Sequence, residues 1–152
     1  MKRPLRTLLM FALVLSAAPV LADAPIGQYA QFVSDDVTIK DTKTLLEWER
    51  KSLREKRNFA AATTGCLGFG RLPTVKELLT LVDEQPHQEY EFGKTVTKTI
   101  DQNAFGSYTA EDAAYWSSTP TGGANERWGV SFKDGTMVKL SESGQGYARC
   151  VK

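Results

Sequence analysis

Cys66 and Cys150 are the residues whose type and spacing say most about the chemistry of this 152-residue chain. They are its two cysteines, and 84 positions separate them. Two thiols in an oxidising compartment usually form a disulfide, which here would close a long loop. Two alternatives remain. A metal site needs three or four ligands, and the single histidine, His87, is far from either cysteine in the sequence. A catalytic thiol needs a base and an orienting group, and no spacing suggests them.

Other residues with acid–base or charged side chains are interpreted as structural. His87 could act as a general base, but it lies in the polar run 83–89, which is typical of a solvated loop. Asp101 is typical of a turn or a helix cap. Arg71 is expected to form a buried ion pair or to bind backbone carbonyls. We therefore assign no catalytic residue, and we expect no metal and no cofactor.

The first 22 residues have the three parts of a signal peptide. A basic start is followed by the apolar run 8–15, and Val20 and Ala22 suit a cleavage site that would leave Asp23 as the first mature residue. A retained membrane anchor is the alternative, although the apolar run is about half the ~20 residues that a spanning helix needs. The sequence thus predicts export to the periplasm or to the cell exterior.

Removal of this segment would change the charge balance. The whole chain has 19 Lys and Arg against 18 Asp and Glu, and three of the basic residues but no acidic residue lie in 1–22. The mature chain therefore keeps 16 basic and 18 acidic residues, a balance that gives no general attraction to nucleic acid. No membrane span is expected after the signal, because no apolar run of about 18 residues follows it. The remaining length favours one domain after a short lead-in, residues 23–35.

Two strands and a helix are predicted at the start of this domain. Val37–Asp41 alternates apolar and polar residues, and Leu45–Arg50 returns after a turn, so the two segments are expected to form a hairpin. The first helix is predicted over Lys51–Thr64, which is rich in Arg, Glu, Lys and Ala. Gly65 is placed to end this helix.

The second predicted helix has a clear start. Thr74 is a helix-capping residue, and Glu77 follows three residues later, which together indicate a capping box. An apolar stripe at helical spacing follows, made by Val75, Leu78, Leu79 and Val82. The helix is predicted to end near Glu84.

The carboxy-terminal half begins with a segment, residues 85–113, that lacks clear periodicity. A long irregular segment is often a binding segment, and the alternative is a packed connector with Ile100 and Phe105 as buried plugs. Four strands are predicted after it, at 115–119, 128–132, 136–140 and 147–151.

A bulged turn with a left-handed Gly135 is predicted between the second and third of these strands. It would pair Val130 with Val138 and Trp128 with Leu140, which gathers all four side chains on one face. Strands at both ends of the domain with helices between them predict an α+β fold, closed by the meeting of its end strands.

Several short motifs follow one another between Val37 and Lys152. They are Ile39-Lys40-Asp41-Thr42-Lys43-Thr44-Leu45 with Trp48, Arg71-Leu72-Pro73-Thr74 with Glu77-Leu78, Ile100-Asp101 with Phe105, Tyr115-Trp116-Ser117-Ser118-Thr119, Phe132-Lys133-Asp134-Gly135, and Arg149-Cys150-Val151. Their order and spacing resemble the bacterial Lcl carboxy-terminal domain family, and on this basis the domain spans residues 36–152. The chain departs from the family at Gly70, where members often carry Trp.

The resemblance implies a C-type-lectin-like fold, with two helices packed on antiparallel strands, and a disulfide between Cys66 and Cys150. It implies little about activity, although some members occur in surface proteins that adhere to sulfated polysaccharides. Lectins of this fold hold calcium with a Glu-Pro-Asn or Gln-Pro-Asp motif, and this chain has Gln85-Pro86-His87 instead. Pairing of both cysteines would leave none for the chemistry of the similarly folded sulfatase-modifying enzymes.

A lectin-like domain would present its ligand contacts on a loop surface, here residues 85–127. The binding candidates in this region are Tyr108, Tyr115, Asn125 and Arg127. We expect an exported, non-enzymatic binding module of the bacterial envelope that recognises a polysaccharide or an envelope protein. The alternatives are an envelope hydrolase or transferase with an unrecognised site, and a structural subunit of an envelope assembly.

Overall fold

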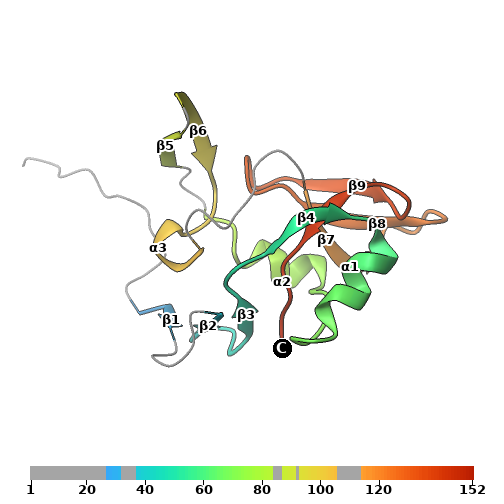
Figure 1. Ribbon diagram of the computed structural model, residues 1–152, viewed down its shortest axis with the longest axis horizontal. Helices are drawn as coiled ribbons and strands as arrows, with labels where there is room; N and C mark the ends of the chain where they lie inside the picture. The colour runs from blue at the N-terminus through green and yellow to red at the C-terminus, as the bar shows by residue number, and fades with distance from the viewer. Residues whose placement is uncertain (1–26, 32–36, 84–86, 92, 106–113) are drawn as a thin grey trace, which may run out of the picture.

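Three sheets and three short helices make up the part of the chain that the computed structural model describes, residues 27–31, 37–83, 87–91, 93–105 and 114–152 (Figure 1). This arrangement confirms the predicted α+β class. The predicted signal peptide, residues 1–22, lies outside these ranges, as does Tyr108. No helix within these ranges is both long enough and apolar enough to cross a membrane.

The first sheet is a small antiparallel one. It contains β1 (Tyr29–Gln31), β2 (Thr38–Asp41) and β3 (Glu47–Glu49), in that order. The predicted hairpin is confirmed, since Ile39 pairs with Trp48. Its second strand begins two residues later than predicted, because Leu45 has a left-handed backbone (φ 64°) and still belongs to the turn. The buried Asp41 carboxylate holds this turn by accepting a 2.7 Å hydrogen bond from the Thr44 hydroxyl.

The second sheet has five strands in the order β4-β10-β7-β8-β9. These are β4 (Leu53–Arg57), β7 (Tyr115–Pro120), β8 (Glu126–Val130), β9 (Met137–Ser141) and β10 (Gly146–Ala148). Strand β10 is antiparallel to β4 and parallel to β7. It therefore joins the amino-terminal half of the domain to the carboxy-terminal hairpins.

The first helix is shorter than predicted. Leu53–Arg57 forms β4, and helix α1 spans Phe59–Cys66. The segment has good helix formers, but backbone pairing with β10 overrides this weak local preference. Asn58 then starts the helix, since its side chain accepts a hydrogen bond from the Ala61 amide. Gly65 lies inside α1 and does not end it.

Helix α2 (Val75–Leu79) confirms the predicted capping box, with both reciprocal hydrogen bonds between Thr74 and Glu77. It ends at Leu79, earlier than predicted, because the chain turns so that the Asp83 amide can donate to the Thr99 carbonyl. Arg71 makes the predicted ion pair, with Glu77 at 2.7 Å, but half of the Arg71 side chain is exposed.

The segment predicted as irregular contains regular structure. Strands β5 (His87–Glu91) and β6 (Lys94–Lys98) pair as a two-stranded hairpin that points away from the other elements in Figure 1. Helix α3 (Gln102–Phe105) follows. The hairpin was not predicted because its strands are mostly polar, with Tyr90 and Val96 as isolated apolar residues and no apolar alternation. Asp101 has the predicted capping role, since its carboxylate accepts from the Ala104 amide at 2.8 Å.

The predicted register of the β8–β9 hairpin is wrong. Val130 pairs with Met137 and Trp128 with Lys139, one residue away from the predicted pairing. The cause is Phe132, which leaves the strand and enters the core, where its carbonyl accepts hydrogen bonds from both the amide and the hydroxyl of Thr99. The turn is therefore longer, although its glycine is left-handed as predicted.

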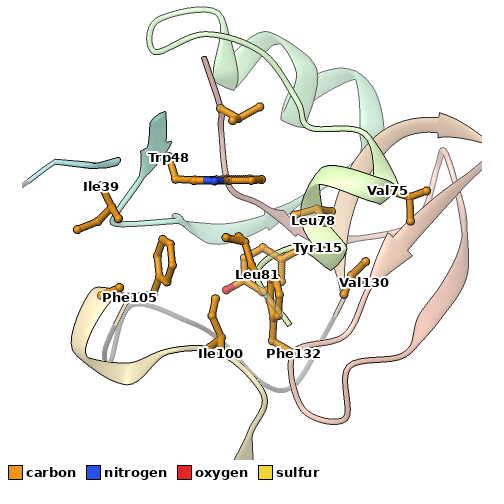
Figure 2. Close-up of a cluster of buried hydrophobic side chains, with 12 residues drawn as sticks. Ile39, Trp48, Val75, Leu78, Leu81, Ile100, Phe105, Tyr115, Val130 and Phe132 are labelled. Atoms are coloured by element: carbon orange, nitrogen blue, oxygen red, sulfur yellow. The ribbon is translucent and has the colours of Figure 1, made fainter. Parts of the chain in front are cut away.

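Two clusters of buried side chains form the core. In the larger core cluster, side chains from several elements meet, and Figure 2 shows Trp48, Phe105 and Tyr115 converging in it from β3, α3 and β7. The smaller core cluster lies under α1, and its buried members are Ala62, Cys66, Leu72, Trp116, Ala148 and Cys150. Helix α1 packs on β4, β7 and β10, and α2 packs on β7 and β8.

The last four residues lie between two other segments of the chain. Lys152 and Glu47 exchange backbone hydrogen bonds on one side, and Val151 and Arg71 exchange them on the other. This confirms that the ends of the domain meet. Gly70 is required beside this segment, because a Cβ at position 70 would collide with the Val151 carbonyl.

Arg149 stands at the start of this segment and is fully buried. Its Nη1 donates to the carbonyls of Glu49 (2.8 Å) and Arg50 (2.6 Å), and its guanidinium carbon lies 4.6 Å from the centre of the Phe105 ring. Burial lowers the pKa of Arg149 and raises the pKa of Glu49 nearby. Carbonyl oxygens and an aromatic face thus replace the water that a buried cation loses.

Cys66 at the end of α1 and Cys150 beyond β10 form a disulfide, and both are fully buried. The double variant Cys66→Ala/Cys150→Ala should lower the free energy of unfolding by about 4–5 kcal/mol, because the 84-residue loop is no longer closed in the unfolded chain. Urea unfolding measures this change. As a control, reductant should destabilise the wild type but leave the double variant unaffected. A decrease of less than about 1 kcal/mol in the free energy of unfolding of the double variant would contradict the expectation.

The Arg71–Glu77 pair makes stability depend on acid pH. The hydrogen bond from Arg71 lowers the pKa of Glu77 from 4.5 to about 2. The ionised carboxylate therefore contributes stability above about pH 4.5, and this contribution is lost as the pH falls towards 2. Because half of the Arg71 side chain is exposed to solvent, which screens the pair, we expect about 1 kcal/mol or less.

Glu77→Gln tests this, since Gln keeps the capping hydrogen bonds and removes the charge. The variant should lose less stability than the wild type between pH 4.5 and pH 2 in thermal unfolding. Glu55→Gln is the control, because that side chain is 83% exposed, and its profile should follow the wild type. Parallel profiles for Glu77→Gln and the wild type would exclude the proposed linkage.

Candidate functional site

A groove of about 430 Å³ lies between the start of α1, the start of β8 and the end of β9. We call it the α1–β9 groove, and its lining residues are Asn58, Phe59, Ala60, Asn125, Ser141, Glu142 and Ser143. Two backbone hydrogen bonds hold its walls together: the Phe59 amide donates to the Glu142 carbonyl, and the Glu142 amide donates to the Asn125 carbonyl. Glu142 is therefore fixed between the helix and the β7–β8 side of the sheet.

Arg127 lies beside the groove and is held by three neighbours. Its Nε donates to Glu142 Oε1 at 2.7 Å, and its Nη1 donates to the Ser118 carbonyl at 3.2 Å. Its guanidinium carbon lies 4.4 Å from the centre of the Phe59 ring. About a quarter of the Arg127 side chain is exposed (26%). The ion pair and the ring contact fix the guanidinium as part of the groove wall.

The groove presents neutral polar groups around this ion pair. Asn125, Ser141 and Ser143 are exposed, and the two serine hydroxyls are 3.0 Å apart, so either can donate to the other. Asn125 has a left-handed backbone (φ 56°), as expected for a residue that ends a loop before a strand. Hydroxyls and amides both donate and accept hydrogen bonds, so this surface suits a ligand rich in hydroxyl groups.

The smaller core cluster supports the groove from below. The Phe59 ring packs edge-on against Trp116, with ring centres 5.7 Å apart. Trp116 is fully buried, and its Nε1 donates to the Arg57 carbonyl at 2.7 Å. Because the Cys66–Cys150 disulfide belongs to the same cluster, it holds α1 against the sheet that carries the other groove wall.

The four predicted binding residues have different positions in the structure. Asn125 lines the groove and Arg127 lies directly beside it, so the fold brings these two together. Tyr115 is fully buried in the larger core cluster, 5.0 Å from the Phe132 ring, and takes no part in the groove. Tyr108 lies outside the described residues.

The rest of the groove was not predicted from the sequence. Phe59 was placed within a longer helix, and Ser141, Glu142 and Ser143 were outside every predicted strand. One local signal was available at Asn58, a capping residue that could have indicated the start of α1. The contact between α1 and residues 141–143 is long-range, and nothing local predicts it.

Within the described residues, no group of three or more His, Cys, Asp or Glu side chains is placed to hold a metal ion. His87 begins β5. The residues that line the groove include one ionisable side chain, Glu142. The groove thus presents neutral hydrogen-bonding groups and one ion pair at its surface, and these groups can form hydrogen bonds with a ligand.

Residues 37–152 match the model of the Lcl C-terminal domain family, which covers the groove, both core clusters and the disulfide. The chain belongs to the Lcl C-terminal domain family. A search of curated proteins found no match to it. All the residues that line the groove of this Lcl C-terminal domain lie within the matched region.

The left-handed backbone at Asn125 predicts how substitutions at this position affect the stability of the domain. Asn125→Ala should lower the free energy of unfolding by about 1 kcal/mol, because alanine is strained in this conformation. Asn125→Gly should change it by less than about 0.5 kcal/mol, because glycine adopts this conformation freely. Urea unfolding of both variants measures the difference, and equal stabilities would show that no strain arises at this position.

Proposed function

We propose that this Lcl C-terminal domain is an exported, non-enzymatic binding module of the bacterial envelope that recognises a polysaccharide at the α1–β9 groove. The observation that carries the proposal is the composition of the groove: exposed Asn125, Ser141 and Ser143 surround an ion pair whose charges already satisfy each other. Such a surface can exchange many hydrogen bonds with sugar hydroxyls.

The size and support of the groove favour ligand binding. Its volume of about 430 Å³ lies within the range of sites that bind small ligands or parts of larger ones. Its walls are joined by backbone hydrogen bonds and rest on a core cluster that contains the disulfide. A preformed site of this kind loses little conformational freedom when a ligand binds.

The C-type-lectin-like fold and the export of the chain are parts of the same proposal. The meeting of the first and last segments of the domain, at Glu47 and Lys152, supports such a fold. The buried disulfide is compatible with an oxidising compartment such as the periplasm or the cell exterior. We propose residues 1–22 as the signal peptide that directs the chain there.

A binding screen with the mature chain tests the proposal, using a glycan array and, in parallel, an envelope-protein extract. At least one polysaccharide should bind above background, and Asn125→Gly should weaken its binding about tenfold through the loss of one or two hydrogen bonds. The control is Asn103→Ala, which removes an exposed amide on α3, on the opposite side of the molecule from α1 in Figure 1.

The control variant should bind like the wild type. Absence of any glycan signal would reject the polysaccharide proposal, and capture of an envelope protein alone would replace it with a protein-binding role. Equal binding by Asn125→Gly and the wild type would remove the groove as the site of contact.

A further inference from the structure

We propose that the α1–β9 groove selects uncharged polysaccharide chains and excludes sulfated or carboxylated ones. This inference rests on the proposed binding function and adds to it the chemical class of the ligand. Three features of the groove carry it: the sign of its exposed charge, the restraint of its nearest cation, and the neutral polar groups that remain.

The ionisable side chain that lines the groove is an acid. Glu142 is the one charged residue among those that line it, and 30% of its side chain is exposed. Its backbone amide and carbonyl are both hydrogen-bonded to the groove walls, and its carboxylate accepts a hydrogen bond from Arg127, so the side chain is held at the groove. A sulfate or carboxylate in the groove would lie close to this carboxylate, in surroundings less polar than water.

The nearest cation is already engaged. Arg127 donates to the Glu142 carboxylate and to the Ser118 carbonyl, and its flat face covers the Phe59 ring. The Glu142 carboxylate offsets the charge of this guanidinium, and an anion that took its place would leave a half-buried carboxylate without its partner. Arg127 therefore offers little net attraction to an anionic chain.

The charges around the groove do not reverse this balance. Arg57 precedes the capping Asn58, and the Glu55 carboxylate lies 3.9 Å from its guanidinium. Glu126 follows Asn125 and accepts a hydrogen bond from the Thr121 hydroxyl at 3.2 Å, which adds a second negative charge at this end. The exposed Lys139 lies two residues before Ser141 on β9, so the charges around the groove balance and give no general attraction to polyanions.

The remaining contacts match hydroxyl groups. Ser141 and Ser143 can each donate and accept, and the exposed Asn125 adds an amide. The Phe59 ring is covered by Arg127 on one face and packs edge-on against Trp116, so the groove recognises polar edges of sugars more than their apolar faces. An uncharged chain satisfies these groups and leaves the ion pair in place.

Matched pairs of polysaccharides test the inference. The mature chain is titrated with dextran, laminarin and hydroxyethyl cellulose, and with dextran sulfate, laminarin sulfate and carboxymethyl cellulose. At least one neutral member should bind at least tenfold more tightly than its charged counterpart, and its affinity should change less than twofold when the salt concentration rises.

Two carboxylate variants locate the cause. Glu142→Gln frees Arg127 and removes the negative charge, so the preference for the neutral member should fall at least fivefold. Glu47→Gln is the matched control, because Glu47 also forms an ion pair, with Lys152 at 3.4 Å, and is also 30% exposed, but lies on β3 outside the groove. The control should keep the wild-type preference. Ser143→Ala, at an exposed position, should weaken neutral binding and provides a second test if Glu142→Gln does not fold.

The outcomes separate this inference from the proposed function. Tighter binding of the sulfated or carboxylated members by the wild type would overturn the inference and leave the polysaccharide-binding function standing. An unchanged preference in Glu142→Gln would also overturn it. Failure of every polysaccharide to bind would reject the proposed function itself, and the inference with it.

Discussion

The buried carboxy-terminal segment, Arg149 to Val151, is the constraint on which the rest of the domain depends. Removing the Arg149 cation from water is costly, and the carbonyls of Glu49 and Arg50, from the other end of the domain, offset part of this cost by accepting from its Nη1. Cys150 adds a covalent link to α1, and Val151 pairs on one side with Arg71. One short segment therefore fixes β3, α1 and the approach to α2 relative to one another.

The geometry of the groove depends on this buried carboxy-terminal segment. The disulfide holds α1 on the β4–β10–β7 side of the large sheet, and Trp116 fills the space beside it. Phe59 then packs on Trp116 and positions Arg127, which in turn pairs with Glu142. The groove, made of loop residues and a helix start, is thus held in shape because a packed and cross-linked cluster lies directly beneath it.

Particular elements show where sequence reasoning succeeds and where it fails. The capping box at Thr74 and Glu77 was predictable because both hydrogen bonds are local. Strand β4 was predicted as a helix because its residues favour helix, and only the distant β10 decides otherwise. The β8–β9 register failed because Phe132 leaves the strand to enter the core, where Thr99 binds its carbonyl. Two of the four predicted binding residues, Asn125 and Arg127, lie at the groove because they belong to the predicted loop surface 85–127. Glu142 was missed because it lies outside that surface and outside every predicted strand.

The sequence by itself determined the α+β class, the local helix signal at Thr74 and, through its order of motifs, membership of the Lcl C-terminal domain family. These depend on residue types and on contacts a few positions apart. The tertiary structure decided which polar residues become neighbours: Phe59 and Glu142, far apart in the chain, meet because β4 and β10 pair and the disulfide holds α1 beside them. Such contacts arise from packing and from the satisfaction of buried charge over the whole domain, which no local pattern encodes.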